Sequence, residues 1–518
     1  MNAKHLIFPL ACMASLGGAP KRCPQQIPRP LHVSGGLVQG VLNGQTGVTV
    51  FKGIPFAAPP VGPLRWKAPQ PVQPWKGVRI CNAFGPSPMQ MKPVSFFMIG
   101  PEFVVPPEPL GEDCLYLNVW TAAKSPEEKR PVMLWIYGGG FITGGSAAAG
   151  YSGEAMAKKG IIFVSFNYRL GAFGFLAHPG LSAEDPHHAS GNYALLDQIA
   201  ALKWIKKNIR AFGGDPDQVT IAGQSAGSAS VNCLLASPLA RGLFQGAIAE
   251  SGSMVLENPL IRMKTLAVAE KQGIALAKKL NAKTIQELRA LPAKTIQATF
   301  GFYAPIADGY VMPASVAEIY KQSLQTHIPF LTGWNAGEGF LMGIKKKTDF
   351  AKEAKEYGPD SAAFSKYFPS ETDAQALASQ IELSVDKTIG VPQYAWAIKQ
   401  NENSRAKTYL YRFTRKPPAT GDKKRFGAYH TAEIGYALHN LDSIQRPWEP
   451  PDRKLEEIMS DYWVNFVKTG NPNGAQLPDW PAFSALDPET MFLDEDPSAR
   501  KLPDREALNF LYSRYPGR

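Results

Sequence analysis

The sequence is short of cysteine and has no cysteine motif of the kind that holds a metal ion. Its 518 residues include five cysteines, and no two of them form a C-x-x-C pair, so we do not expect a structural zinc site. Five are too few for a disulfide-rich scaffold, although they allow one or two bridges. The five are Cys12, Cys23, Cys81, Cys114 and Cys233.

Long apolar runs, long charged runs and linkers are missing as well. No stretch reaches ~18 uninterrupted apolar residues, the length of a membrane span. Asn167 and Arg169 interrupt the nearest candidate, residues 160–177. The net charge of +11 comes from scattered lysines and arginines, which is typical of a solvated surface and argues against nucleic-acid binding. No repeat or Pro/Ser linker divides the chain, so we expect one domain over residues 30–518.

The N-terminus begins "MNAKHLIFPLACMASLGGAPKRCP", in which one lysine precedes a short apolar run and small residues follow at 17–19. This order is typical of a secretory signal peptide, although Pro9 interrupts the run. We therefore expect residues 1–25 to be a signal peptide or a disordered N-terminus. The protein is then secreted or periplasmic, with a cytoplasmic location as the alternative.

Apolar strands alternate with amphipathic helices along the remainder of the chain. Segments such as "PVMLWIYG", "GIIFVSFNY" and "GAIAES" are nearly all apolar, as strands covered on both faces should be. Residues 193–210 repeat apolar side chains at helical spacing, and residues 261–281 and 453–469 are also predicted helices. An early antiparallel hairpin followed by β-α-β units predicts an α/β protein with a mixed sheet and helices on both faces.

The segment "TIAGQSAGSAS" contains the pattern G-x-S-x-G, with Ser225 between Gly223 and Gly227. The pattern alone is weak evidence for a catalytic serine, because a serine in an ordinary glycine turn would also produce it. Here it follows an apolar strand and precedes a helix-forming stretch, which is the context of a nucleophile elbow. Upstream, "WIYGGGFITGG" places three glycines directly after a strand, where backbone N–H groups could bind an oxyanion.

The chain that carries these two features resembles the type-B carboxylesterases. That family includes cholinesterases and bacterial p-nitrobenzyl esterases. The resemblance runs from roughly residue 35 to the end of the chain. It rests on segments that occur in the family's order: "FKGIPFAAPPVGPLRW", "EDCLYLNVW", "WIYGGGF", "NYRLGAFGF", "GNYALLDQ", "FGGDPDQVTIAGQSAG" and "YWVNFVKTGNPNG".

The resemblance implies an α/β-hydrolase fold, with a central mixed, mostly parallel sheet, and a Ser-Glu-His triad in that chain order. It assigns the nucleophile to Ser225, the acid to Glu338 in "GWNAGEGFLMG" and the base to His430 in "AYHTAEIGY". The implied reaction is hydrolysis of a small-molecule ester through an acyl-enzyme, without a metal or an organic cofactor. The oligomeric state is left open. The implied oxyanion donors are the N–H groups of Gly139, Gly140 and Ala226.

The resemblance also implies supporting residues. Gln224 precedes the nucleophile, and Ser251 and Glu433 match a buried polar network behind the histidine. Cys81 and Cys114 match a family disulfide, which is consistent with export because such bridges persist in oxidising compartments. The implied structural ion pairs are Arg65 with Glu112 and Arg169 with Asp197.

Two departures from the family bear on the substrate. The family usually has glutamate where this chain has Gln224, and the loop between Cys81 and Cys114 has no tryptophan, although cholinesterases place a choline-binding indole there. We therefore expect neutral esters to be preferred over choline esters. The same loop is rich in residues that would line an apolar entrance or simply pack beneath it: Met89, Met91, Phe96, Phe97, Met98 and Phe103.

Two alternatives belong to other functional classes. An amidase, a lactonase or an acyltransferase could use the same triad. A non-catalytic binding homologue, such as a neuroligin-like adhesion protein, keeps the fold but loses triad residues, whereas all three match here.

Overall fold

The computed structural model describes residues 30–94, 100–257, 262–299, 301–339, 343–402, 404–419 and 427–515. The expected signal peptide over residues 1–25 lies outside this set. Within the described ranges, no helix has the length and apolar character needed to cross a bilayer.

An eleven-stranded sheet forms the centre of the described chain, in the order β18-β17-β16-β15-β12-β11-β9-β10-β8-β4-β3. Every pairing from β17 to β10 is parallel, and the pairings at the two ends are antiparallel. The strands are β3 (Val41–Leu42), β4 (Thr49–Pro55), β8 (Tyr116–Thr121), β9 (Arg130–Ile136), β10 (Ile162–Phe166), β11 (Gly214–Gln224), β12 (Gly246–Glu250), β15 (Phe330–Asn335), β16 (Thr408–Phe413), β17 (Glu489–Leu493) and β18 (Ser498–Lys501).

The apolar character of the central strands follows from their position. All five residues of β10 and of β12 and all six of β15 are buried, because helices cover both faces of a parallel sheet. Small accessory sheets lie outside the main one, and the expected early hairpin is the antiparallel pair β3–β4. The accessory strands are β1 (Leu31–Val33), β2 (Gly36–Gln39), β5 (Val78–Ile80), β6 (Ser87–Pro88), β7 (Leu110–Gly111), β13 (Lys264–Thr265) and β14 (Ile306–Ala307).

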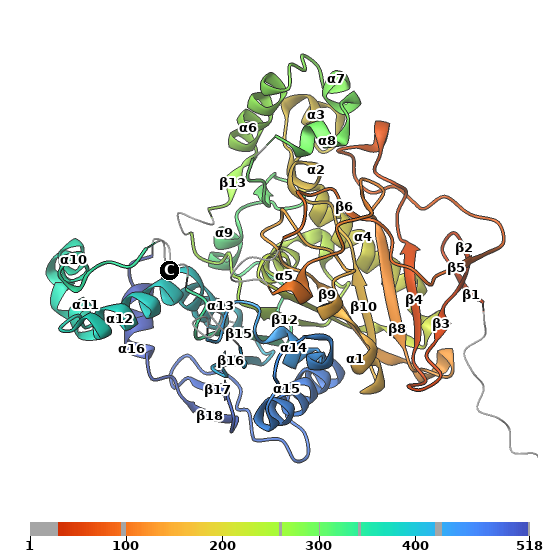
Figure 1. Ribbon diagram of the computed structural model, residues 1–518. Coiled ribbons are helices and arrows are strands. Elements are labelled where there is room, and N and C mark those ends of the chain that lie inside the picture. Colours follow the sequence, from red (N-terminus) through yellow and green to blue (C-terminus); the bar gives the residue numbers. More distant parts are fainter. Residues whose placement is uncertain are drawn as a thin grey trace, which may run out of the picture.

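The helices cover the two faces of the sheet and form two outlying groups, which Figure 1 shows beside α3 at the top and around α12 at the left. Helices α4, α5 and α13 pack against the sheet and neighbour α9 and α16, whereas α1 and α15 pack against it as a second set with α14. They are α1 (Glu154–Lys158), α2 (Gly171–Phe175), α3 (Pro179–Glu184), α4 (Tyr193–Asn208), α5 (Ala226–Ala236), α6 (Leu266–Lys279), α7 (Ile285–Ala290), α8 (Ala293–Gln297), α9 (Val316–Lys321), α10 (Lys347–Glu353), α11 (Ser361–Tyr367), α12 (Asp373–Val385), α13 (Val391–Asn401), α14 (Ile434–Ala437), α15 (Pro450–Thr469) and α16 (Arg505–Tyr512).

The three predicted helices are present, with ends set by local chemistry. The helix expected at 453–469 is α15, which starts earlier because Pro450 occupies a first-turn position and Glu449 caps it. It ends where Gly470 adopts a left-handed conformation (φ 72°). The other two are α4, which begins at the expected residue 193 and ends at Asn208 before a 3-10 turn, and α6, which begins later than the expected 261.

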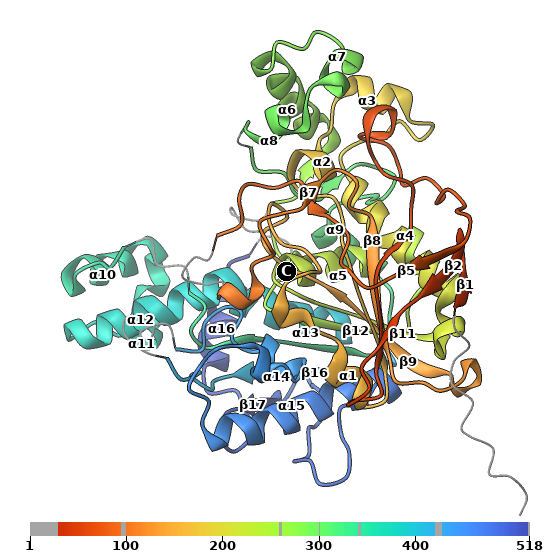
Figure 2. The ribbon, with the colours of Figure 1, turned by 45° about the vertical axis from the view of Figure 1, so that its right-hand side comes forward.

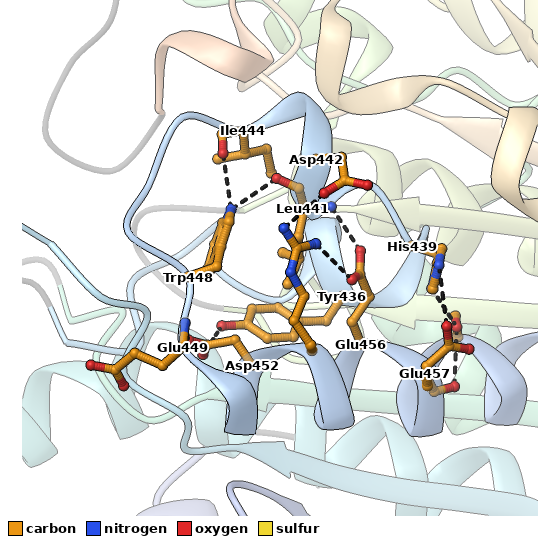
Figure 3. Close-up of polar contacts among 12 residues, drawn as sticks. Tyr436, His439, Leu441, Asp442, Ile444, Trp448, Glu449, Asp452, Glu456 and Glu457 are labelled. Atoms are coloured by element: carbon orange, nitrogen blue, oxygen red, sulfur yellow. Dashed lines mark hydrogen bonds and ion pairs between the residues drawn. The ribbon is translucent and has the colours of Figure 1, made fainter.

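Helix α15 also holds the chain that leads away from α14. Figure 3 shows Trp448 Nε1 donating to the backbone oxygens of Leu441 (2.8 Å) and Ile444 (2.9 Å). Glu456 of α15 accepts from the Leu441 N–H at 2.8 Å, and Asp452 accepts from the Tyr436 hydroxyl at 2.8 Å. The bonds to Glu456 and Asp452 hold the segment around α14 against a long helix that itself packs on the sheet (Figure 2), and the Trp448 bonds join parts of the connecting loop to each other.

Candidate active site

A sharp turn joins β11 to α5 and carries Ser225 at its tip. The strand ends at Gln224, the helix begins at Ala226, and Ser225 between them has φ 59° and ψ −121°. A positive φ is costly for a residue with a side chain, so it persists only where neighbours enforce it. Here the Ser225 N–H donates to the backbone oxygen of Glu250 at the end of β12, at 2.8 Å.

The two glycines of G-x-S-x-G are required by close approach of the backbone. A Cβ at Gly227 would lie 2.0 Å from the carbonyl oxygen of Ile136, at the end of β9. A Cβ at Gly223 would lie 2.6 Å from the carbonyl carbon of Gly227. Helix α5 can therefore begin directly beside β9 only because both positions lack a side chain.

The structure brings together the three residues predicted as a triad, although they are far apart in the chain. Ser225 Oγ lies 2.8 Å from His430 Nε2, and His430 Nδ1 lies 2.5 Å from Glu338 Oε2. Glu338 follows the end of β15 and is completely buried, while His430 precedes α14 and is 7% exposed. A hydroxyl, an imidazole and a carboxylate in this series can activate the hydroxyl as a nucleophile.

Two donors fix the orientation of the Glu338 carboxylate. Its Oε1 accepts from Ser251 Oγ at 2.9 Å and from the Asn335 N–H at 2.7 Å, which leaves Oε2 directed at the imidazole. The amide of Asn335 extends this network by donating to Glu433 Oε2 at 2.6 Å. Ser251 and Glu433, both predicted to lie in a polar network behind the histidine, are therefore connected to Glu338 through named hydrogen bonds.

Gln224 has a structural reason to be an amide. Its side chain is buried, and Nε2 donates a hydrogen bond to the backbone oxygen of His430. An ionised glutamate at this position would have no proton to donate to a carbonyl. The amide therefore links the end of β11 to the segment that carries the histidine.

Glu250 is a buried carboxyl that the sequence analysis did not select. It ends β12 with no exposure, and its Oε1 accepts from Trp463 Nε1 at 2.8 Å. Burial raises the pKa of Glu250 to about 8. Burial, and then the nearby Glu250 and Glu338 carboxylates, raise the pKa of Glu433 well above its ordinary value. The one sequence signal for Glu250 was an acidic residue at the end of an otherwise apolar strand.

The glycine turn after β9 lies beside the serine. Gly139 and Gly140 have φ values of 109° and 63°, which suit glycine, and both line the cavity that contains Ser225. Ala226 is the first residue of α5, so its N–H is at a helix N-terminus, where partial positive charge favours an anion. These three residues are the ones predicted to bind an oxyanion.

The cavity above Ser225 has a volume of about 230 Å³ and a largely apolar wall. Among the described residues that line it, none is an aspartate, glutamate, lysine or arginine. The wall includes Val94, Phe103, Val104, Val105, Ile142 and Tyr151.

The apolar loop residues named from the sequence divide into three groups. Phe103 lines the cavity. Met89 instead lies near Cys114 and Phe173 in a separate small pocket, and Met91 is 64% exposed. Phe96, Phe97 and Met98 lie outside the described residues.

The structure does not contain the disulfide expected between Cys81 and Cys114. Of the cysteines in the described ranges, Cys81, Cys114 and Cys233 are all buried free thiols. Burial raises the pKa of Cys81 to about 11 and that of Cys114 well above its usual range. Both thiols are therefore protonated at neutral pH, whereas the thiolate is the form that reacts to make a disulfide.

Both expected ion pairs form, and the pair of Arg169 with Asp197 is buried. Arg65 makes two hydrogen bonds to the Glu112 carboxylate, at 2.6 and 2.5 Å. Arg169 likewise donates two hydrogen bonds to the Asp197 carboxylate, from Nε at 2.8 Å and from Nη2 at 2.7 Å. Bidentate pairs of this kind fix geometry as well as charge.

Comparisons with known proteins identify the family of this chain. The model of the carboxylesterase family matches residues 28–511. This chain belongs to the carboxylesterase family. It is 37% identical over 478 residues to the fumonisin B1 esterase of Sphingopyxis macrogoltabida. The aligned region covers 87% of this chain and 84% of that protein. It is 34% identical over 500 residues to the para-nitrobenzyl esterase of Bacillus subtilis (strain 168), across 91% and 97% of the two chains.

Solved structures give the same result for the fold. A PNB esterase structure superposes with a TM-score of 0.78 at 32% identity, covering 93% of this chain and 98% of that one. The expected α/β-hydrolase fold is thus confirmed, and the carboxylesterase is an enzyme that acts on small ester substrates.

Proposed function

We propose that this carboxylesterase hydrolyses neutral esters through an acyl-enzyme formed on Ser225. The observation that carries the proposal is the continuous contact from Ser225 Oγ through the His430 imidazole to the Glu338 carboxylate. Ser225 is the nucleophile, His430 is the general base and then the general acid, and Glu338 orients the imidazole and stabilises its cation.

In the first half of the reaction, Ser225 Oγ attacks the ester carbonyl carbon while His430 Nε2 accepts the hydroxyl proton. The tetrahedral intermediate collapses, the C–O bond to the alcohol breaks, and His430 returns the proton to the departing alcohol oxygen. In the second half, a water molecule attacks the acyl-enzyme with the same proton transfers and releases the acid.

The oxyanion of each tetrahedral intermediate is bound by the N–H groups of Gly139, Gly140 and Ala226. Two observations support this assignment of the donors. The glycine turn lies at the cavity wall, and the N-terminus of α5 lies next to Ser225. Fixed donors of this kind are already oriented when charge develops, and one such donor contributes on the order of 10²–10³ in turnover.

The preference for neutral esters rests on the charge of the site. A cationic substrate is bound best by an anionic group or by the face of a tryptophan ring. The position before Ser225 is the uncharged Gln224, and no acidic side chain or tryptophan is found among the described residues that line the cavity. The apolar wall suits aryl or medium-length acyl groups, and the para-nitrobenzyl ester named for a relative is a fitting test substrate.

Purified enzyme assayed with p-nitrophenyl acetate, butyrate and octanoate tests the proposal. We expect Ser225→Ala to lower kcat on the order of 10⁵-fold or more, as removal of a triad serine does elsewhere. Ser361→Ala, at the start of α11, is the matched control and should retain parental kcat. Equal turnover of the parent and the Ser225 variant would refute the nucleophile. Butyrylcholine turnover equal to that of a neutral butyrate ester would refute the substrate preference.

Two expectations from the sequence belong to the same proposal. We propose that residues 30–518 form a single catalytic domain and that residues 1–25 direct export and are then removed. Mass spectrometry of the mature protein from the periplasm or the medium should find a chain that starts near residue 25. An intact N-terminus on protein recovered only from the cytoplasm would contradict export.

A further inference from the structure

Three carboxylates from separate parts of the chain converge beside α12. Glu382 belongs to α12, Asp386 begins a π-helical turn (Asp386–Gly390), and Asp504 precedes α16. One oxygen from each lies within 4.8 Å of the others. Figures 1 and 2 show α12 and α16 as neighbours on the side of the molecule away from β1.

Among these three carboxylates, Asp386 gives the clearest indication of a bound ligand. Its side chain is completely buried, and neither carboxylate oxygen has a hydrogen-bond partner among the described residues. Asp504 Oδ1 is also buried and unpaired in that same set. Because a buried oxygen without a partner is destabilising, and more so if it is charged, native structures rarely leave three in one place.

The cations nearby do not provide the missing partners. Arg412 Nη1 donates to Asp504 Oδ2, while Arg412 Nε has no partner within the described ranges. Arg505 donates instead to the backbone oxygens of residues 485 and 486. Lys387 pairs with Glu353. Three carboxylates therefore face one guanidinium, which leaves two negative charges when all are ionised.

The number and the type of ligands select the ion. Ca²⁺ takes about six to eight oxygen ligands, carboxylates among them, whereas Mg²⁺ usually keeps several waters and is bound through only one or two carboxylates. Three carboxylate oxygens that all lie within 4.8 Å of one another therefore suit Ca²⁺. We propose that Glu382, Asp386 and Asp504 bind a calcium ion, which neutralises the two excess charges and satisfies the unpaired oxygens.

The ion would join elements that support the acid of the triad. A Cβ at Gly339, next to Glu338, would lie 3.0 Å from the Ile381 backbone oxygen and 3.2 Å from the Ser384 side chain, so this loop rests on α12. Calcium would tie α12 to α16 and thereby hold the surface behind Glu338. We therefore expect calcium binding to raise the thermal stability of the enzyme.

Full-length enzyme treated with EDTA and exchanged into chelator-free buffer provides the test. Isothermal titration with CaCl₂ should show one site in the parent. At a hundredfold excess over Kd, the midpoint of thermal unfolding should rise by about 2–3 °C in a chain of this length. MgCl₂ should give a smaller rise.

Asp386→Asn and Glu382→Gln each retain the size of the side chain and should abolish the titration signal and the calcium-dependent rise. Circular dichroism checks that each variant is folded, and the more accessible Glu382 provides a result if Asp386→Asn does not fold. Asp349→Asn, on the nearby α10, is the control that should bind like the parent. No calcium binding by the parent, or unchanged binding in both variants, would overturn the proposal. Magnesium binding as tight as calcium would overturn the choice of ion.

Discussion

Replacing Glu250 by glutamine should make the enzyme more stable, and increasingly so as the pH rises. Glu250 has an ordinary pKa of 4.5, and burial raises that pKa to about 8 in the folded protein. Between these values the folded protein keeps a proton that the unfolded chain has released. The contribution of Glu250 to the free energy of unfolding therefore falls as pH rises through this window, and it changes no further above about pH 8.

The size of the effect follows from the two pKa values. At about 1.4 kcal/mol per pH unit, the contribution of Glu250 falls by about 5 kcal/mol across the whole window, and by about 3 kcal/mol between pH 5.5 and 7.5. Glutamine keeps an oxygen for the Trp463 N–H and carries no charge at any pH. Because the Glu250 charge also raises the pKa of Glu433, its removal acts in the same direction.

Differential scanning calorimetry at a fixed scan rate measures this effect. For 518 residues the entropy of unfolding is about 1.1 kcal/mol/K. The gap in Tm between Glu250→Gln and the parent should therefore widen by about 2–3 °C from pH 5.5 to 7.5. Glu371→Gln, at an exposed position, is the chemical control and should show no such widening. A gap for Glu250→Gln that stays constant over this pH range would refute the reasoning.

Two further predictions concern the elbow. Gly227→Ala places a Cβ 2.0 Å from the Ile136 oxygen and should cost about 3 kcal/mol or more, seen as a lower Tm. Gly44→Ala, where a Cβ meets nothing within 4 Å, is the control, and equal Tm values would contradict the packing argument. Gln224→Glu removes the donor to the His430 carbonyl and should lower kcat/KM for p-nitrophenyl butyrate about tenfold. The same variant should raise the ratio of butyrylthiocholine to neutral-ester turnover, and an unchanged ratio would contradict the charge argument.

Local sequence was enough to predict the elbow and the central strands. The glycines beside Ser225 are dictated by contacts made within a strand-turn-helix unit and with β9, and apolar runs of five or six residues mark buried strands directly. Spacing alone could not have paired Ser225 with His430, which are 205 residues apart, or His430 with Glu338, which are 92 apart. Those assignments came from the family resemblance, and the structure then placed the three side chains in contact.

What the sequence could not predict depends on tertiary contacts between distant segments. The bond from Gln224 to the His430 carbonyl joins residues 206 apart, and the burial of Glu250 depends on Trp463 in α15. The disulfide was carried over from the family, but both thiols are buried and protonated here. The wall of the cavity likewise combines Val94 and residues 103–105 with the turn after β9.

The most direct test of the central claim is to identify the residue that an organophosphate, which reacts with the nucleophile in place of the ester, modifies covalently. Enzyme treated with an organophosphate, digested and analysed by mass spectrometry should carry one adduct per chain, on Ser225. The extent of labelling should match the loss of p-nitrophenyl butyrate hydrolysis, and Ser225→Ala should remain unlabelled. Complete inactivation with the adduct on another residue, or full activity in the chain labelled at Ser225, would contradict the account.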